Sequence, residues 1–267
     1  MRHRSIRPAA LVCFAAIVAA SGCQGRRQAS LAGRATDEWT RSYPLSPTGE
    51  LQIIGANGSV DIRGGTGTTV DVRAERVARA SSDAAAREIL PRVEIREDVS
   101  PDKIVLQTQG LAGIVIGVDV AVNYRVTMPT TARARVRAVN GDVTIAGIEG
   151  QVVLSSTNGE VMGRNLRGGV DARAVNKGVT ISLAALRRDP IDLRATNGSV
   201  DLSVPADVNA NLEANYTNGS LDIKDLAYEP IGEQTRRRAR GRLNEGGTPI
   251  TITTVNGNIR VRPKTQE

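Results

Sequence analysis

The stretch VDARAVNKGVTISLAALRRDPIDLRATNGSVDL, residues 170–202, contains the same pattern twice. In each copy, small or apolar residues occupy alternate positions before an asparagine, as Leu193 and Ala195 do before Asn197. An apolar residue also follows three positions after the asparagine, as Val200 does here. A period of two is typical of a β-strand with one buried face. Each copy is therefore predicted to form two strands joined by a corner at the asparagine.

The corner is an Asn-Gly dipeptide or a near variant, and it recurs along the chain. The asparagines concerned are Asn57, Asn140, Asn158, Asn176, Asn197, Asn218 and Asn256. The middle intervals are 18, 18, 21 and 21 residues, a spacing typical of architectures that add one coil per repeat. The glycine is expected to supply the positive φ of a sharp corner. One corner departs from the dipeptide, because Lys177 separates its asparagine from its glycine.

Two architectures fit this repeat. Asn-Gly between alternating strands is a strong hairpin signal, which would give an antiparallel β meander. In all seven copies, however, the asparagine is in phase with the inward-facing residues before it, and a hairpin tip has no reason to keep that phase. Stacked coils would bring these amides about 4.8 Å apart, close enough for a hydrogen-bonded ladder at the edge of the core. We predict an all-β single-stranded β-helix, or β-solenoid, of 18–21-residue coils, with the antiparallel meander as the alternative.

The N-terminal residues have the organisation of an export signal. Three arginines precede an uncharged apolar run at residues 9–20, which is too short to span a bilayer. The following Ala20-Ser21-Gly22-Cys23 resembles a bacterial lipobox, although Ala20 stands where leucine is usual. Lipidation of Cys23 is therefore predicted, with ordinary secretory cleavage as the alternative. Under lipoprotein sorting, Gln24 after the cysteine points to the outer membrane.

The chain is expected to divide into a signal peptide (1–22), a lipidated tether (23–47), a β-solenoid domain (48–263) and a short tail (264–267). The N-terminal part of the domain is less regular. Within it, the Ala-rich residues 82–90 are predicted to form a short helix that ends at Pro91.

The residues left after signal removal limit the available chemistry. His3 is the only histidine and Cys13 lies in the signal, so the mature chain would have no histidine and one acylated cysteine. These residues cannot build a disulfide framework, a His/Cys zinc site or a His-based triad. No catalytic, cofactor-binding or metal-binding residue is predicted. Three basic residues leave with the signal, which lowers the formal charge from +7 to +4. With aromatics at 2% of the chain, nucleic acid is an improbable partner.

Carboxylates are the one catalytic option that remains. Asp61, Asp201 and Asp222 each follow their asparagine by four positions. On stacked coils they would project outward and could imitate the carboxylate cluster of a polysaccharide lyase or hydrolase. The equivalent positions of the intervening coils interrupt such a column, because they carry Thr144, Met162 and Thr180. A carbohydrate-active β-helix enzyme is therefore the alternative to a non-catalytic module.

A second candidate contact region is rich in arginine. Residues 228–248 are expected to form a mobile loop that leaves the last coils. The loop carries Arg236, Arg237, Arg238, Arg240 and Arg242. This cluster could contact anionic lipid headgroups or acidic polysaccharide, or it could be a solvated loop without a partner.

The ordered run of motifs resembles a known family. The segment Tyr124–Pro129 is followed by repeated Asn-Gly-x-Val-x-Ile units, and then by Gly247–Ile252 before the last corner at Asn256. Over residues 48 to 263 this order is similar to that of the bacterial putative-adhesin β-strand-repeat domains, a family of unknown function. The resemblance implies a β-helix-like fold on an exported protein, an adhesive role and no assigned catalytic residue. We therefore expect a non-catalytic cell-envelope lipoprotein that contacts the membrane through its anchor and binds an envelope polysaccharide or another envelope protein.

Overall fold

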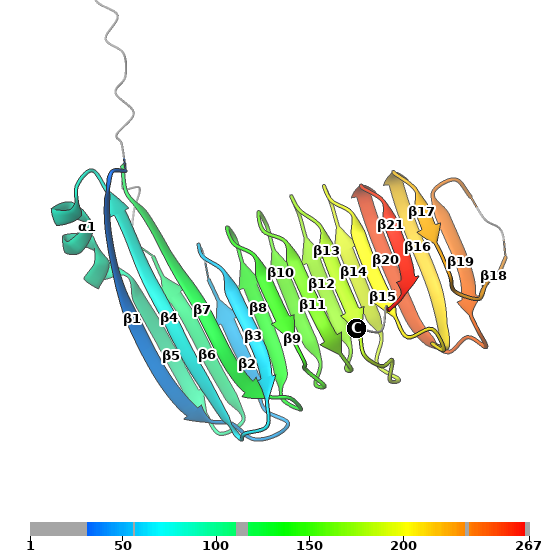
Figure 1. Ribbon diagram of the computed structural model, residues 1–267, viewed down its shortest axis with the longest axis horizontal. Helices are drawn as coiled ribbons and strands as arrows, with labels where there is room; N and C mark the ends of the chain where they lie inside the picture. The colour runs from blue at the N-terminus through cyan, green and yellow to red at the C-terminus, as the bar shows by residue number, and fades with distance from the viewer. Residues whose placement is uncertain (1–30, 56, 111–116, 233–234, 265–267) are drawn as a thin grey trace, which may run out of the picture.

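The computed structural model describes residues 31–55, 57–110, 117–232 and 235–264. These residues form an all-β structure built from two large mixed sheets that lie face to face (Figure 1). The predicted signal, Cys23 and most of the predicted tail lie outside the described residues. No helix within the described ranges is long and apolar enough to cross a bilayer.

The first sheet has ten strands among the described residues. In spatial order they are β1 (Gly33–Pro44), β4 (Thr69–Ala80), β7 (Asp119–Pro129), β3 (Val60–Gly65), β9 (Val143–Ala146), β11 (Val161–Leu166), β13 (Val179–Leu183), β15 (Val200–Val204), β21 (Ile259–Pro263) and β17 (Leu221–Ile223).

The second sheet has eleven strands in the same ranges. In spatial order they are β18 (Tyr228–Pro230), β19 (Arg238–Leu243), β16 (Ala210–Asn218), β20 (Thr248–Asn256), β14 (Ile191–Ala195), β12 (Val170–Ala174), β10 (Val152–Ser156), β8 (Arg133–Ala138), β2 (Glu50–Ile54), β6 (Lys103–Gln109) and β5 (Glu94–Ser100).

Each repeat contributes one strand to each sheet, and the Asn corner joins the two strands. Strands of neighbouring repeats pair in parallel and in register, so that Leu154 lies beside Ala172 and Ala172 beside Leu193. An antiparallel meander does not allow this pairing, so the alternative drawn from the Asn-Gly signal is wrong for the repeats. Antiparallel pairs do occur at the two ends, where β1, β4 and β5 lie at one end and β18 and β19 at the other.

The core is a thin layer between the sheets. Alternate residues of the central strands are buried, as in β12 and β14, where positions one, three and five face inward. The buried side chains are mostly Val, Ile, Leu and Ala. Tyr43 and Tyr124 are the aromatic residues that the core contains among the described residues, in agreement with the low aromatic content of the chain. The outward positions of the same strands form the side surfaces of the stack.

The coils are stacked out of chain order at both ends. The coil formed by β20 and β21 lies between the coil of β14 and β15 and that of β16 and β17. Similarly, β2 and β3 lie between β6 and β7 on one side and β8 and β9 on the other. Strands that are distant in the sequence therefore become neighbours, and this determines which outward side chains meet.

Three features differ from the sequence-based expectation or add to it. Residues 33–44, assigned to the tether, form strand β1, which pairs along its whole length with β4. Residues 228–248, expected to be a mobile loop, contain β18 and β19, and β19 pairs antiparallel with β16. The short helix is present as α1 (Asp83–Ile89), and the Ser82 hydroxyl accepts a hydrogen bond from the Ala85 backbone N–H at its N-terminus.

Candidate functional site

The seven corner asparagines lie in one row along the stack. Each side-chain amide nitrogen donates to the amide oxygen of the neighbouring asparagine. The donor–acceptor pairs are Asn140 to Asn57 (2.6 Å), Asn158 to Asn140 (2.5 Å), Asn176 to Asn158 (2.6 Å), Asn197 to Asn176 (3.3 Å), Asn256 to Asn197 (2.8 Å) and Asn218 to Asn256 (2.7 Å). At one end the Asn57 amide donates to the Val120 carbonyl at 3.1 Å. The longest bond of the row occurs at the corner where Lys177 interrupts the dipeptide.

The position of this row differs from the expectation in two ways. The row was expected at the edge of the core, but six of its members are exposed and only Asn57 is half-buried. The row also follows the spatial order of the coils, so Asn256 bridges Asn197 and Asn218. The amides therefore form a solvent-facing edge of the stack. Their exposure lowers the stability that each bond contributes, because water competes for the same groups.

The corner glycines are required by close packing rather than by a left-handed backbone. Among them, Gly58 has a clearly left-handed φ of 112°, and Gly219 at 158° is close to extended. A Cβ atom at Gly141 or Gly159 would lie 1.9 or 1.8 Å from the carbonyl oxygen of the glycine in the adjacent coil. The expected reason for these glycines was therefore wrong at most corners, because the neighbouring backbone leaves no space for a side chain.

Two hydroxyl side chains near the corners were not identified from the sequence. Ser156 is buried, donates to the Gly141 carbonyl at 2.8 Å and accepts from the Gly159 backbone N–H at 2.9 Å. Thr254 is also buried and donates to the Gly198 carbonyl at 2.9 Å. Both occupy the position two residues before the asparagine, where the repeat usually has a small apolar residue. A hydroxyl at that position is the sequence signal that could have identified them.

The residues just before the asparagines form a second row on the same edge. In spatial order they alternate between valine and threonine: Val139, Thr157, Val175, Thr196, Val255 and Thr217. The three valines are 43%, 41% and 40% exposed. The amide row and this β-branched row together give the stack an uncharged edge with a regular repeat.

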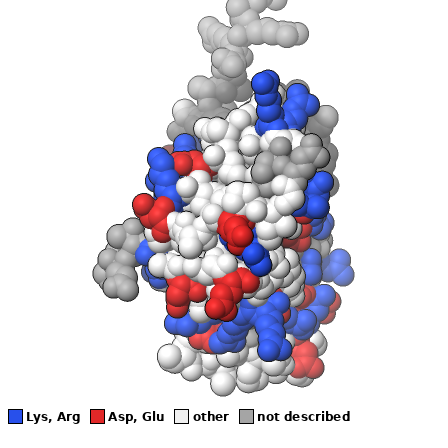
Figure 2. Space-filling view, turned by 90° about the vertical axis from the view of Figure 1, so that its right-hand side faces the viewer, with Lys and Arg blue, Asp and Glu red and all other residues white. Residues whose placement is uncertain are grey.

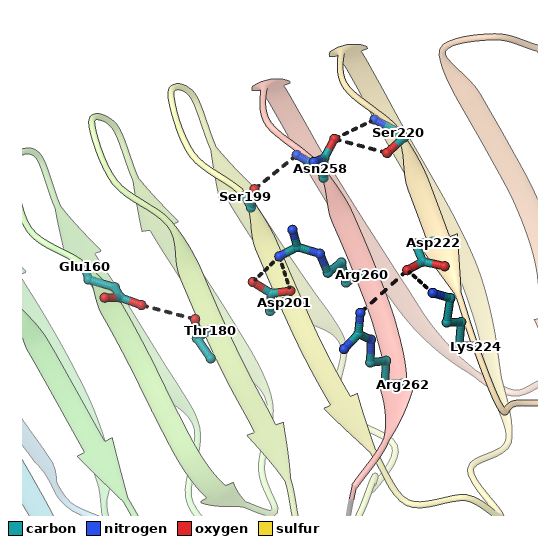
Figure 3. Close-up of polar contacts among 10 residues, drawn as sticks. All are labelled: Glu160, Thr180, Ser199, Asp201, Ser220, Asp222, Lys224, Asn258, Arg260 and Arg262. Atoms are coloured by element: carbon teal, nitrogen blue, oxygen red, sulfur yellow. Dashed lines mark hydrogen bonds and ion pairs between the residues drawn. The ribbon is translucent and has the colours of Figure 1, made fainter.

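On the outer face of the first sheet, the carboxylates predicted to form a column are separated. In the register of this sheet, Arg260 lies between Asp201 and Asp222, because β21 is inserted between β15 and β17. The Arg260 guanidinium donates to the Asp201 carboxylate at 3.1 Å. Figure 3 shows the two carboxylates on opposite sides of β21, each turned toward a basic side chain.

The other two predicted carboxylates also have basic partners. Asp222 lies 3.3 Å from the Lys224 ammonium and 3.6 Å from the Arg262 guanidinium. Asp61 lies at a distance from both in the sheet and pairs with Arg63 at 3.2 Å. The structure therefore does not bring the three predicted carboxylates together. These ion pairs are solvent-exposed and contribute about 0–1 kcal/mol each to stability.

A groove lies on the same face across β11, β13 and β15. It has a volume of about 1020 Å³, and its floor is formed by short side chains such as Thr180, Ser182 and Ser203. At one wall the Lys264 ammonium donates to the Asn165 side-chain oxygen. Asn165 has a φ of 53° in the irregular end of β11. The groove was not predicted, because it depends on this irregularity and on the stacking of three coils.

Three of the five arginines of the predicted cluster form ion pairs, with two carboxylates. Arg238 and Arg240 both bind Glu213 of the neighbouring strand β16, at 2.7 and 3.0 Å. Arg242 pairs with Glu229 at 2.7 Å. Figure 2, which views the C-terminal end of the stack, shows acidic and basic side chains intermingled on this surface. The cluster is therefore part of a paired strand and not a free basic loop.

Two buried phenols have perturbed acidity. Burial raises the pKa of Tyr124 to about 12, although a 2.8 Å hydrogen bond with the Thr108 hydroxyl acts in the opposite direction. Burial and the 2.6 Å hydrogen bond to Glu97 raise the pKa of Tyr43. Both phenols are neutral and structural. Within the described ranges, no group of three or more His, Cys, Asp or Glu side chains is placed to hold a metal ion.

Comparisons with known proteins find similar solved structures and one matching family. One similar solved structure is a "putative cell adhesion protein" from Clostridium sporogenes, with a TM-score of 0.49 and 11% sequence identity over 85% of this chain and 100% of that chain. A second is a "putative adhesin" from Bacteroides fragilis, with a TM-score of 0.37 and 13% identity over 85% of this chain and 97% of that chain. A third is a "putative adhesin" from Parabacteroides merdae, with a TM-score of 0.32 and 11% identity over 86% of this chain and 97% of that chain. The comparison with curated proteins found no significant match.

A family model described as Toastrack DUF4097, a bacterial domain of unknown function, matches residues 93–262. The matched segment begins beside β5 and covers every parallel coil except that of β2 and β3. The resemblance inferred from the ordered Asn-Gly units is thereby confirmed, and the chain belongs to the Toastrack DUF4097 family.

Proposed function

We propose that this protein is a non-catalytic module of the bacterial cell envelope, built as a β-solenoid that presents its side surfaces to a binding partner. The in-register parallel stack supports a solenoid, because each coil pairs its backbone with the coils on both sides. Such pairing holds outward side chains at a fixed spacing of about 4.8 Å along the stack. A surface of this kind suits an adhesive or structural contact with an envelope polysaccharide or another envelope protein.

The observation that carries the non-catalytic proposal is the arrangement of the outer-face carboxylates. Glycoside hydrolysis uses two carboxyl groups about 5–10 Å apart that face one substrate. Asp201 and Asp222 are two strand spacings apart, about 9.6 Å, but the Arg260 guanidinium occupies the position between them and binds Asp201. Each carboxylate is engaged by a basic side chain of the same face. The two carboxylates therefore balance neighbouring positive charges, an arrangement that argues against a role as an acid–base pair in catalysis.

Attachment to the membrane through Cys23 is part of the same proposal. The lipobox-like segment at residues 20–23 supports it. Strand β1 begins at Gly33, ten residues after the cysteine. A chain of that length spans at most about 35 Å, so a lipid on Cys23 would keep the first strand close to the membrane. Sorting to the outer membrane rests on Gln24.

The enzyme alternative can be separated from this proposal with one double substitution. Asp201→Asn/Asp222→Asn and the wild type would each be incubated with a panel of soluble polysaccharides, and new reducing or unsaturated ends would be measured. We expect no product from either protein and a change in unfolding free energy of about 1 kcal/mol or less. The matched control is Asp171→Asn/Asp192→Asn, which removes two paired carboxylates from the other sheet. Product formation by the wild type and by the control, but not by the Asp201/Asp222 variant, would establish the enzyme instead.

A further inference from the structure

Two strands of the second sheet, β8 and β19, carry a line of three arginines, and those of β19 pair with Glu213 and Glu229. In β8 the outward positions are Arg133, Arg135 and Arg137, and all three side chains are exposed. Alternate residues of a strand point to the same face and lie about 6.8 Å apart. The three guanidinium groups therefore project from one face in a single line across the stack.

The neighbouring coils show why this line differs from other arginines of the sheet. In β12 and β14 the equivalent arginines, Arg173 and Arg194, each bind an aspartate two positions earlier in the same strand. In the register of the sheet, the position of that aspartate is occupied in β8 by Arg135. The arrangement that neutralises the arginines of β12 and β14 is therefore absent from β8.

No other carboxylate replaces the missing aspartate. Among the described residues, the side chains of Arg133 and Arg137 have no hydrogen-bond or ion-pair partner. Arg135 lies 4.0 Å from Glu50, which is also 3.8 Å from Lys103 and is itself only 18% exposed. One carboxylate is thus shared between two cations and does not reach the rest of the line.

The surrounding surface adds one carboxylate, that of Glu50. The outward residues of the flanking strands β2 and β10 are Glu50, Gln52, Ile54, Val153 and Ser155. Including β6, this part of the face has four basic side chains, Lys103 and the three arginines, against the single carboxylate of Glu50, an excess of three positive charges. Apart from Glu50, the outward side chains of the two flanking strands are neutral, so the positive charge forms a narrow strip.

We propose that this strip on β8 is the binding surface for a linear acidic polysaccharide, whose carboxylates are held by the guanidinium groups of Arg133, Arg135 and Arg137. Guanidinium forks bind carboxylates with two parallel hydrogen bonds. A single line of positive charges whose flanks carry one carboxylate and otherwise neutral side chains fits an extended chain, whereas a membrane surface would be matched by basic residues spread over several strands. The proposal rests on the binding role proposed above and names the class of partner. The proposal also assigns polysaccharide binding to β8 instead of the Arg236–Arg240 segment that the sequence had suggested.

The test compares two double substitutions that remove the same net charge. Arg133→Gln/Arg137→Gln removes the two unpaired arginines, and Arg173→Gln/Arg194→Gln removes two paired ones from the same face. Binding of the purified full-length chain to polygalacturonate would be measured by calorimetry at low and at physiological ionic strength, with neutral dextran as the control polymer. Vesicles of phosphatidylcholine with phosphatidylglycerol would be the membrane arm.

We expect the wild type to bind polygalacturonate and not dextran, with affinity that falls as salt rises. The Arg133/Arg137 variant should bind about 30-fold more weakly at low salt, as expected for two lost cation contacts with an anionic surface. The affinity of the Arg173/Arg194 variant should fall by less than about threefold, since in the wild type each of these arginines is already paired with an aspartate. The thermal melts of both variants should match that of the wild type.

Equal losses of affinity for polygalacturonate in the two variants would overturn the proposal, because binding would then depend on net charge alone. If the Arg133/Arg137 variant lost vesicle binding but bound polygalacturonate as the wild type does, the proposal would be overturned in favour of a lipid contact. A wild type that binds neither probe would overturn it as well. These outcomes differ from failure of the proposed function, which would appear as polysaccharide cleavage that depends on Asp201 and Asp222.

Discussion

Gly159→Ala is expected to lower the free energy of unfolding by about 3 kcal/mol, at the upper end of the usual cost of overpacking. A Cβ atom at this position would lie 1.8 Å from the carbonyl oxygen and 2.2 Å from the carbonyl carbon of Gly141. Both atoms belong to the backbone of the adjacent coil, so no side-chain rotation relieves the clash. The two coils must separate, which strains the 2.8 Å hydrogen bond from the Asn158 backbone N–H to the Val139 carbonyl.

Chemical denaturation followed by far-ultraviolet circular dichroism would measure this loss. The matched control is Gly55→Ala near the corner of the β2–β3 coil, where an added Cβ atom meets no heavy atom within 4 Å. We expect this control to change stability by about 0.5 kcal/mol or less. Equal stability of the two variants would mean that the corner at Asn158 is an open, solvent-exposed turn and does not pack against the coil beside it.

Leu166→Ala is expected to cost about 4 kcal/mol, in the upper part of the range for truncating a buried leucine. Gly163 occupies an inward position in register with Ile145 and Ile181, but it brings no side chain to the core. The Leu166 side chain fills that space, since a Cβ atom on Gly163 would lie 2.7 Å from its Cδ1 atom. Truncation of Leu166 therefore leaves a gap beside Gly163, which has no side chain of its own.

A double-mutant cycle makes this prediction sharper. Gly163→Ala alone should cost about 1–3 kcal/mol, because the new methyl group meets the Leu166 and Ile181 side chains. In Leu166→Ala/Gly163→Ala the same methyl group enters the vacated space, so the double variant should lose less than the sum of the single losses. Unfolding free energies from denaturant titration would measure the coupling. Strictly additive losses would contradict the assignment of Leu166 to the space beside Gly163.

Local periodicity was sufficient to predict the strands and corners of the central coils. The alternation before and after Asn158, Asn176 and Asn197 sets which side chains face inward, and the structure has the same alternation. The order of the coils could not be obtained in this way, since each coil offers the same backbone edge to any other. The last coil therefore stacks between two earlier ones without any local signal.

The strands β1 and β19, at the two ends of the stack, were missed for different reasons. In β1, the outer strand of its sheet, most residues are exposed or half-buried and the apolar residues do not alternate regularly. In β19, by contrast, Ala239, Gly241 and Leu243 do alternate with the arginines. The many arginines of the segment made this strand-like alternation difficult to recognise in the sequence. Charged residues are a common means of protecting an edge strand from further pairing.

The candidate contact surfaces were predicted only in part. Outward projection follows from position within a strand, so Asp201, Asp222 and the arginines of β8 could be placed on outer faces. Which charges meet depends on the neighbouring coil, as the insertion of Arg260 between the two aspartates illustrates. The difference between neutralised and unpaired arginines is therefore a property of the stack and cannot be read from one repeat.

Disulfide trapping tests the parallel stacking and its unusual order most directly. In a chain with Cys13 and Cys23 replaced by serine, three cysteine pairs would be compared by peptide mass spectrometry: Asp201→Cys/Arg260→Cys, Ser203→Cys/Arg262→Cys and Asp201→Cys/Asp222→Cys. The first two pairs are direct neighbours in parallel register, so both should form disulfides within one molecule. The third pair is two strands apart, about 9.6 Å, and should remain reduced. A disulfide in the third pair, or in the first pair without the second, would contradict the parallel stack with β21 between β15 and β17.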